Sequence, residues 1–132
     1  MPVSAEIRQL TDATFELMVR KSSGYVLVDF WASDCLPCDL IDPILHQIAT
    51  DYAATMPVMG VHANVYTDIG RACGIMSAPT IVLFKDGVEV TRLPVSEIAQ
   101  RIHASNPGEG LVPQFMAEVQ TGIDTLLANL PP

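Results

Sequence analysis

The sequence predicts an α/β fold, in which a central mixed β-sheet is flanked by helices and an extra helix follows at the C-terminus. Three observations support this prediction. Short β-branched and aromatic runs alternate with segments of helical periodicity. The last two strand-like runs are separated only by a tight turn, which predicts an antiparallel hairpin. A long amphipathic stretch then follows the hairpin.

The first predicted helix follows Leu10. Thr11 can cap its N-terminus with a side-chain oxygen. Phe15 and Val19 then follow at helical spacing, and Gly24 suits the left-handed conformation that ends many helices. These residues indicate one short helix before the first long apolar run.

Residues 25–31 (YVLVDFW) indicate a buried strand that contains one carboxylate, Asp29. A charge inside a buried strand is costly unless it is paired or has a function. The strand leads into Cys35-Leu36-Pro37-Cys38 and then into a helix. The apolar face of that helix comprises Ile41, Ile44, Leu45, Ile48 and Tyr52.

The middle of the chain predicts two more strands and a hairpin. Residues 58–65 indicate the second strand, and residues 69–73 a short helix. Residues 80–84 indicate the third strand, which a Lys-Asp-Gly turn at 85–87 connects to a partner strand at 88–93.

The segment after the hairpin predicts helices only. Ser96 can cap a short helix over residues 97–104, and residues 105–110 form a loop rich in turn-forming residues. Apolar residues then recur at helical spacing from 112 to 130. We expect this last helix to pack on the sheet, with a dimer surface as the alternative, and residues 1–132 to form a single domain.

The composition excludes several classes of partner. Seven basic residues stand against 15 acidic ones, a net charge of −8, while 49% of residues are apolar and 17% charged. A chain with so few dispersed cations has no patch for a phosphate backbone or an anionic membrane surface. No run resembles a secretory signal or a membrane-spanning helix. Three cysteines do not make a disulfide framework, and we expect a cytoplasmic protein.

Cys35 and Cys38 form a C-x-x-C pair at the start of a predicted helix. The unpaired N–H groups and partial positive charge at a helix N-terminus stabilise a thiolate. The alternative is a structural or zinc-binding pair, but zinc usually has four ligands and no second C-x-x-C or C-x-x-H occurs. Cys73 is interpreted as a small core or surface thiol, and the three histidines as ordinary structural residues.

The order of motifs around this pair resembles that of the thioredoxin family. Residues 26–32 (VLVDFWA) followed by C-L-P-C at 35–38 are similar to the family's active-site strand and motif. Pro-Ile-Leu at 43–45, Ala-Pro-Thr at 78–80 and Phe-Lys-Asp-Gly at 84–87 are similar to its kinked helix, its cis-proline loop and its last hairpin. The resemblance covers about residues 10–93 and implies a thioredoxin-like fold, with a C-terminal helical extension over about 96–130.

The resemblance implies a role for individual residues. Cys35 is the expected nucleophile, and Cys38 the resolving thiol. Asp29 is expected to exchange a proton with Cys38, with a pKa raised by burial. Pro79 is expected to follow a cis peptide bond that faces the cysteines, and Trp31 to pack against the active-site loop. The residues expected to contact the substrate are Trp31, Asp34, Leu36, Pro37, Ala78 and Pro79.

Several positions depart from the family pattern. Asp34 stands where the family usually has Trp, and Leu36 where it has Gly. Asp39 replaces the usual basic residue after the second cysteine, and Gly60 the usual Lys on the second strand. Together with Asp42, these carboxylates should disfavour the Cys35 thiolate, because like charges repel.

These features predict a thiol–disulfide oxidoreductase that reduces protein disulfides through Cys35 and Cys38. The resemblance implies disulfide-containing client proteins, and a thioredoxin-reductase-type flavoenzyme as the electron donor, with no cofactor or metal bound to this chain. We expect a monomer rather than a dimer. The alternative is a non-catalytic binding or chaperone module that docks a partner through its acidic face or its C-terminal helix.

Overall fold

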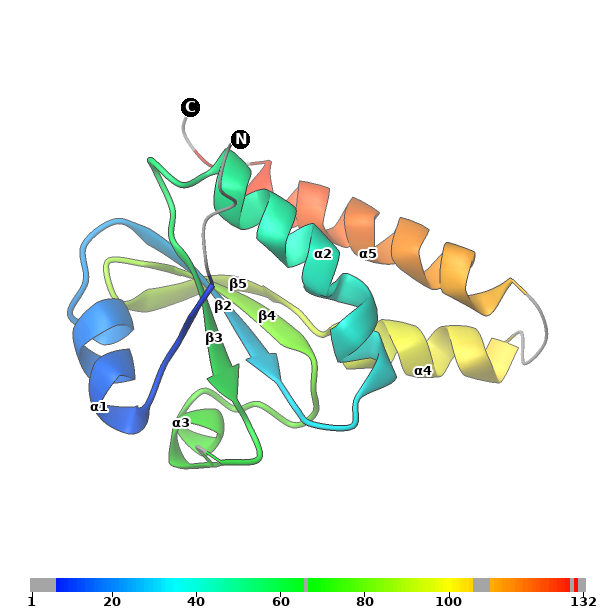
Figure 1. Ribbon diagram of the computed structural model, residues 1–132, viewed down its shortest axis with the longest axis horizontal. Helices are drawn as coiled ribbons and strands as arrows, with labels where there is room; N and C mark the ends of the chain where they lie inside the picture. The colour runs from blue at the N-terminus through cyan, green and yellow to red at the C-terminus, as the bar shows by residue number, and fades with distance from the viewer. Residues whose placement is uncertain (1–6, 66, 106–109, 129, 131–132) are drawn as a thin grey trace.

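The computed structural model describes residues 7–65, 67–105, 110–128 and 130, and Figure 1 shows the path of the chain. In chain order the elements are β1 (Arg8–Gln9), α1 (Asp12–Phe15), the π-helical turn η1 (Glu16–Arg20), β2 (Tyr25–Trp31), α2 (Leu36–Asp51), β3 (Val58–His62), α3 (Thr67–Ala72), β4 (Thr80–Lys85), β5 (Val88–Leu93), α4 (Val95–Ser105) and α5 (Leu111–Leu127).

One sheet with the strand order β1-β3-β2-β4-β5 forms the centre of the molecule. β2 pairs in parallel with β3 and antiparallel with β4, and β3 pairs in parallel with β1. The hairpin of β4 and β5 is antiparallel, as expected from the turn between them. In that turn Asp86 and Gly87 both have positive φ, and a Cβ at residue 87 would meet the carbonyl oxygen of Arg20. The prediction of a mixed sheet is confirmed.

Helices cover both faces of the sheet (Figure 1). α2, α4 and α5 lie on one face, and α1, η1 and α3 on the other. Alternate residues of β2 serve the two cores, because successive side chains of a strand point to opposite faces. Val28 and Phe30 pack with the α1 side, whereas Leu27 packs with the α2 side. By the same alternation Asp29 belongs to the face that α2 covers.

α5 confirms the predicted extra helix at the C-terminus. Its apolar stripe packs on the sheet and on α2, with Val119 and Ile123 fully buried in the same core as Leu27 and Leu83. The stripe that could have made a dimer surface is therefore buried within the chain. No helix in the described part of the chain is long and apolar enough to cross a membrane.

The structure corrects several of the predicted elements and bounds. The short edge strand β1 was not predicted, and β3 ends at His62 rather than at Val65. α4 begins at Val95, so that Ser96 lies inside the helix and does not cap it. The Ser96 hydroxyl does not serve as a cap, because it hydrogen-bonds the Ser77 hydroxyl instead. The backbone N–H of Ser96 donates to the carbonyl oxygen of Pro79 at 3.1 Å.

Candidate active site

The two cysteines occupy the N-terminus of α2, directly after the loop that follows β2. Cys35 is the N-cap residue, and the backbone N–H of Cys38 donates to its Sγ at 3.2 Å. The two residues are joined by a disulfide, with 5.3 Å between their Cα atoms. A sulfur in the N-cap position accepts an N–H group that has no partner within the helix, which is the interaction that favours a thiolate after reduction.

The two sulfur-bearing residues differ in exposure. Cys35 is half-buried, whereas the side chain of Cys38 is buried, with 6% exposed. Between them Leu36 is 64% exposed, and Pro37 lies in the first turn of α2, where its missing N–H costs no hydrogen bond. Cys35 is therefore the cysteine that an external thiol or disulfide can reach first.

The loop before β4 closes the site on the side of Cys35. The Ala78–Pro79 peptide bond is cis, as expected, and Pro79 is buried. The carbonyl oxygen of Ala78 lies 3.9 Å from the Sγ of Cys35. The hydroxyl of Thr80 donates to the carbonyl oxygen of Ser77 at 2.7 Å, which fixes the loop from below. Ala78 and Pro79 thus stand beside the cysteine that is open to solvent.

Asp29 lies on the opposite side, near Cys38. Its side chain is only 7% exposed, and its Oδ1 accepts no hydrogen bond from any residue that the structure describes. Burial, and after it the negative charge of Asp42, together raise the pKa of Asp29 to about 7. The expected rise in the pKa of Asp29 is confirmed, and the carboxyl can exchange a proton near neutral pH.

A cavity of about 410 Å³ adjoins Asp29 and Cys38. Its lining is about half apolar but carries three carboxyl groups, and comprises Ile7, Gln9, Asp29, Trp31, Cys38, Asp39, Asp42 and His46. Cys38, Asp42 and His46 are spaced by four residues, so they fall on one stripe of α2 that faces this cavity. That spacing is visible in the sequence. The cavity was not predicted, because its second wall depends on β1, a strand that the sequence did not predict.

Trp31 is held by residues that sequence reasoning did not select. Its indole Nε1 donates to Oε1 of Gln9 at 2.8 Å, and its ring meets His62 edge to face, with 4.3 Å between ring centroids. Nε2 of His62 is 2.7 Å from Oγ of Ser33 in the active-site loop. His62 is therefore a structural residue, as interpreted, and its particular role is to support Trp31 and the loop. The parallel pairing of β2 and β3 brings Trp31 and His62 together, because their carboxyl ends meet at one edge.

Gly60 stands at the position where the family usually has a lysine on the second strand. It pairs with Asp29 on one side and with Gln9 on the other. A Cβ at residue 60 would lie 2.5 Å from Nε2 of Gln9. The amide of Gln9 therefore fills the space that a side chain at 60 would need, and β3 brings no cation to Asp29.

The acidic residues next to the cysteines do not form one cluster. Asp34 is exposed and has a left-handed backbone, with φ 54°, which Asp tolerates better than most residues. Asp39 and Asp42 belong to the cavity on the other side of the disulfide.

Cys73 is half-buried and outside the disulfide, and burial is the main cause that raises its pKa.

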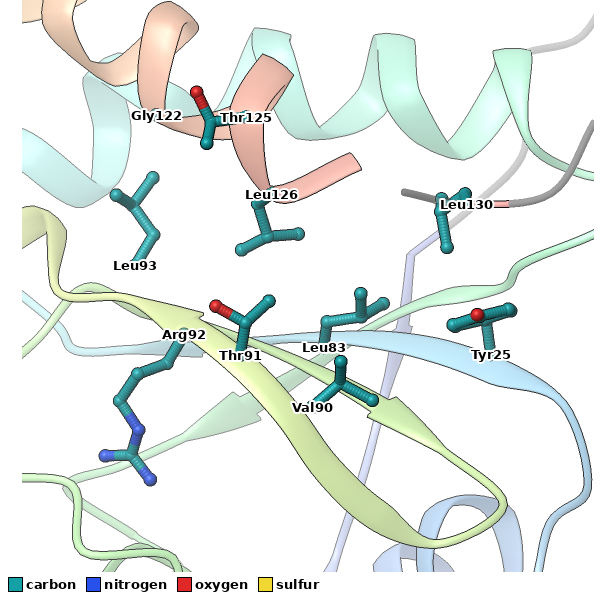
Figure 2. Close-up of a pocket in the computed structure, with 10 residues that line it drawn as sticks. All are labelled: Tyr25, Leu83, Val90, Thr91, Arg92, Leu93, Gly122, Thr125, Leu126 and Leu130. Atoms are coloured by element: carbon teal, nitrogen blue, oxygen red, sulfur yellow. The ribbon is translucent and has the colours of Figure 1, made fainter. Parts of the chain in front are cut away.

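A second pocket, of about 470 Å³, lies between the outer strands and α5, away from the cysteines (Figure 2). Its lining is mostly apolar, and the Arg92 side chain points away from α5. This pocket has neither a thiol nor a carboxylate, and we assign the chemistry to the disulfide site.

Comparison with known proteins gives a consistent result. The Thioredoxin family model matches residues 6–104, which reaches the end of α4 but not α5. Thioredoxin of Pseudomonas aeruginosa is 41% identical over 92 residues, or 69% of this chain and 85% of that protein. Thioredoxin of Mycobacterium tuberculosis is 41% identical over 90 residues, 68% of this chain and 77% of that protein. The crystal structure of oxidized mitochondrial thioredoxin 3 from Saccharomyces cerevisiae matches with a TM-score of 0.61 and 28% identity, covering 66% of this chain and 81% of that chain.

A disulfide at the start of α2, faced by a cis-proline loop and a buried carboxyl, defines a thiol–disulfide exchange centre. With the matches above, the chain belongs to the thioredoxin family. It is accordingly a thiol–disulfide oxidoreductase of the protein-disulfide reductase type, with Cys35 and Cys38 as its redox pair.

Proposed function

We propose that this chain reduces disulfides of client proteins in the cytoplasm, and that Cys35 and Cys38 take separate roles. The observation that carries the proposal is the asymmetry of the disulfide: Cys35 is half-exposed beside Ala78, and Cys38 is buried beside Asp29. The Cys35 thiolate attacks a client disulfide and forms a mixed disulfide. Cys38 then attacks Cys35, which releases the reduced client and restores the disulfide within the chain.

Asp29 acts in the second step as the base for Cys38. Its buried position and its pKa of about 7 support this role. A carboxyl group with this pKa is partly ionised at neutral pH, and its carboxylate is a stronger base than that of an ordinary Asp. The rate of resolution should therefore rise with pH through about 7, as the carboxylate form of Asp29 becomes populated.

The client-contacting surface in this proposal comprises Trp31, Asp34, Leu36, Pro37, Ala78 and Pro79. Its support is the large exposure of Leu36 and the position of the Ala78 carbonyl next to Cys35. An extended client segment can hydrogen-bond backbone groups near the cis-proline.

In this proposal, electrons come from a thioredoxin-reductase-type flavoenzyme. The chain acts as a single-domain monomer, and the burial of the α5 stripe within the chain supports the monomer.

Insulin reduction driven by dithiothreitol tests the proposal. Wild-type protein should accelerate precipitation of the insulin B chain, and Cys35→Ser should remove the acceleration, whereas Cys73→Ser should keep it. Equal rates with wild type and Cys35→Ser would instead favour a non-catalytic binding module. A coupled assay with NADPH and a thioredoxin reductase then tests the electron donor, because oxidation of NADPH should depend on this chain.

A further inference from the structure

The polar cavity beside Cys38 has an inner and an outer end. Asp29 and Cys38 are its buried members, while the side chains of Asp42 and His46 are 59% and 43% exposed. A cavity of about 410 Å³ whose walls include three carboxyl groups, an imidazole and an amide has room for several water molecules. The cavity can therefore give water a passage between the buried Asp29 carboxyl and the solvent.

With a pKa of about 7, Asp29 holds a proton in part of the molecules at neutral pH, and that proton has to leave before Asp29 can take one from Cys38. This step rests on the proposed base role of Asp29. The neighbouring strands supply no charged partner: Gly60 and Ile81 flank Asp29 in the sheet, and Gln9 lies beyond Gly60. The titratable groups that line the passage with Asp29 all come from α2, namely Cys38, Asp39, Asp42 and His46. The exit is therefore made by this helix.

Asp42 and His46 are one turn apart at the outer end, and Nε2 of His46 lies 3.4 Å from Oδ2 of Asp42. An imidazole can accept and release protons near neutral pH, which a carboxylate in water does poorly. No three His, Cys, Asp or Glu side chains in the described ranges converge closely enough to hold a metal ion, so the acidic lining is interpreted through protons.

We propose that the Asp42–His46 pair is the solvent-side proton relay of the resolving step. His46 takes the proton that Asp29 releases into the cavity water and passes it to solvent, while Asp42 orients the imidazole. Neither residue belongs to the client-contacting surface proposed above, and both are positioning residues that act through Asp29.

The step balances in atoms and electrons. The Cys38 S–H proton passes to the Asp29 carboxylate, and the Cys38 thiolate attacks Sγ of Cys35 in the mixed disulfide. The bond between Cys35 and the client sulfur breaks, and the client thiolate leaves with the electron pair and takes a proton from solvent. The dithiol of the chain is oxidised by two electrons and the client disulfide is reduced. The proton on Asp29 then leaves through the cavity water and His46, by the same route that makes the Asp29 carboxylate available before the attack.

Asp42 has a second effect, which is on the pKa of Asp29. Its charge is the second cause, after burial, that raises the pKa of Asp29. Asp42→Asn should therefore lower the pKa of Asp29 and move the midpoint of the resolution rate to lower pH. His46→Gln should lower the rate without the same shift.

The reaction of reduced protein with excess Ellman's reagent isolates the resolving step. Cys35 releases the first thionitrobenzoate, and the attack of Cys38 releases the second in a phase that does not depend on reagent concentration. Full-length chains with Cys73→Ser, which removes the third thiol, serve as the common background. The variants are His46→Gln, Asp42→Asn and Asp29→Asn, with His103→Gln and Asp124→Asn as controls on exposed positions of α4 and α5.

We expect His46→Gln to slow the second phase about tenfold near neutral pH, less than the roughly 10²–10⁴ of a direct base, because it acts through water. Imidazole added to His46→Ala should restore the rate. Rates and pH midpoints for His46→Gln and Asp42→Asn that equal those of the two controls would overturn the relay. If Asp29→Asn is slow in the same experiment, only the relay fails; if Asp29→Asn is also normal, the base role under the proposed function fails.

Discussion

The two sides of the Cys35–Cys38 disulfide are built from different materials. On the side of Cys35 the neighbours are backbone and exposed apolar surface: the Ala78 carbonyl, the cis-proline loop and Leu36. On the side of Cys38 they are ionisable side chains around a cavity, with Asp29 at its buried end. Backbone groups bind any extended chain, whereas ionisable groups control protons. Under the proposed function, this contrast assigns recognition of the client to one side and the chemistry of its release to the other.

The largest effect should come from the exposed side of this comparison. Cys35→Ser removes the proposed nucleophile, and the rate of insulin reduction should fall to that of dithiothreitol alone, because a hydroxyl does not attack a disulfide at neutral pH. Cys73→Ser, at a half-buried thiol outside the pair, is the matched control and should keep full activity. Loss of activity in Cys73→Ser would mean that the reaction depends on Cys73 and would contradict the assignment of the chemistry to Cys35.

The buried side should give the largest effect on stability. The folded pKa of Asp29 lies above its unfolded value, so between about pH 4 and pH 7 the folded state binds more protons, and the free energy of unfolding falls as pH rises through this window. The loss amounts to up to about 4 kcal/mol above pH 7, at 1.36 kcal/mol per pKa unit. Asp29→Asn should remove this slope.

Urea unfolding at pH 4 and pH 8 measures the effect. The difference in the free energy of unfolding between these conditions should shrink in Asp29→Asn and stay at the wild-type value in Asp124→Asn, an exposed carboxylate on α5. An unchanged slope in Asp29→Asn would mean that Asp29 is ionised without penalty, and the contrast between the two sides would lose its electrostatic basis.

A smaller effect should follow from loosening the frame behind the cis-proline loop. Arg92 donates to the carbonyl oxygens of Cys73 at 2.6 Å and Gly74 at 3.1 Å, and it pairs with Glu89. Arg92→Met should lower the free energy of unfolding by about 1–2 kcal/mol, because two carbonyls lose a charged donor at a partly exposed site. Arg101→Met, which breaks the helix-surface pair with Glu118, should have a weaker effect in the same unfolding measurement.

The smallest predicted effect concerns Gly60 and Gln9. Gly60→Ala should displace the Gln9 amide from its place above the sheet and break its hydrogen bond with Trp31, at a cost of about 1 kcal/mol. Because the chain has one tryptophan, its fluorescence follows unfolding and gives the free energy of unfolding of each variant. In a Gln9→Ala background the same substitution should cost less, and equal costs in both backgrounds would exclude the contact.

Much of the fold was predictable because its signals are local. β2 has the predicted bounds, and Thr11 caps α1 as expected. β1 was missed because two exposed residues, Arg8 and Gln9, carry no apolar pattern, and their pairing with β3 is a tertiary contact. The cavity beside Asp29 was missed for the same reason, since Gln9 and Ile7 form its second wall.

The candidate site was predictable in its residue types but not in its division. The motif order gave Cys35, Cys38 and Asp29, and the structure adds that Asp34 is turned to solvent while Asp39 and Asp42 belong to the cavity. A count of acidic residues near the cysteines could not separate these groups, because the side of the disulfide on which each lies depends on the turn before α2 and on the helical stripe. The support of Trp31 by His62 depends on strand register and was equally hidden.

The most direct test of the division between the two cysteines is a trapping experiment with a disulfide-containing client. Reduced Cys38→Ser should form a mixed disulfide with the client through Cys35, stable on a non-reducing gel and located at Cys35 by mass spectrometry. Reduced Cys35→Ser should trap little, because Cys38 is 6% exposed. Equal trapping by both variants, or a bond located at Cys38, would contradict the assignment of recognition to one side of the disulfide and proton chemistry to the other.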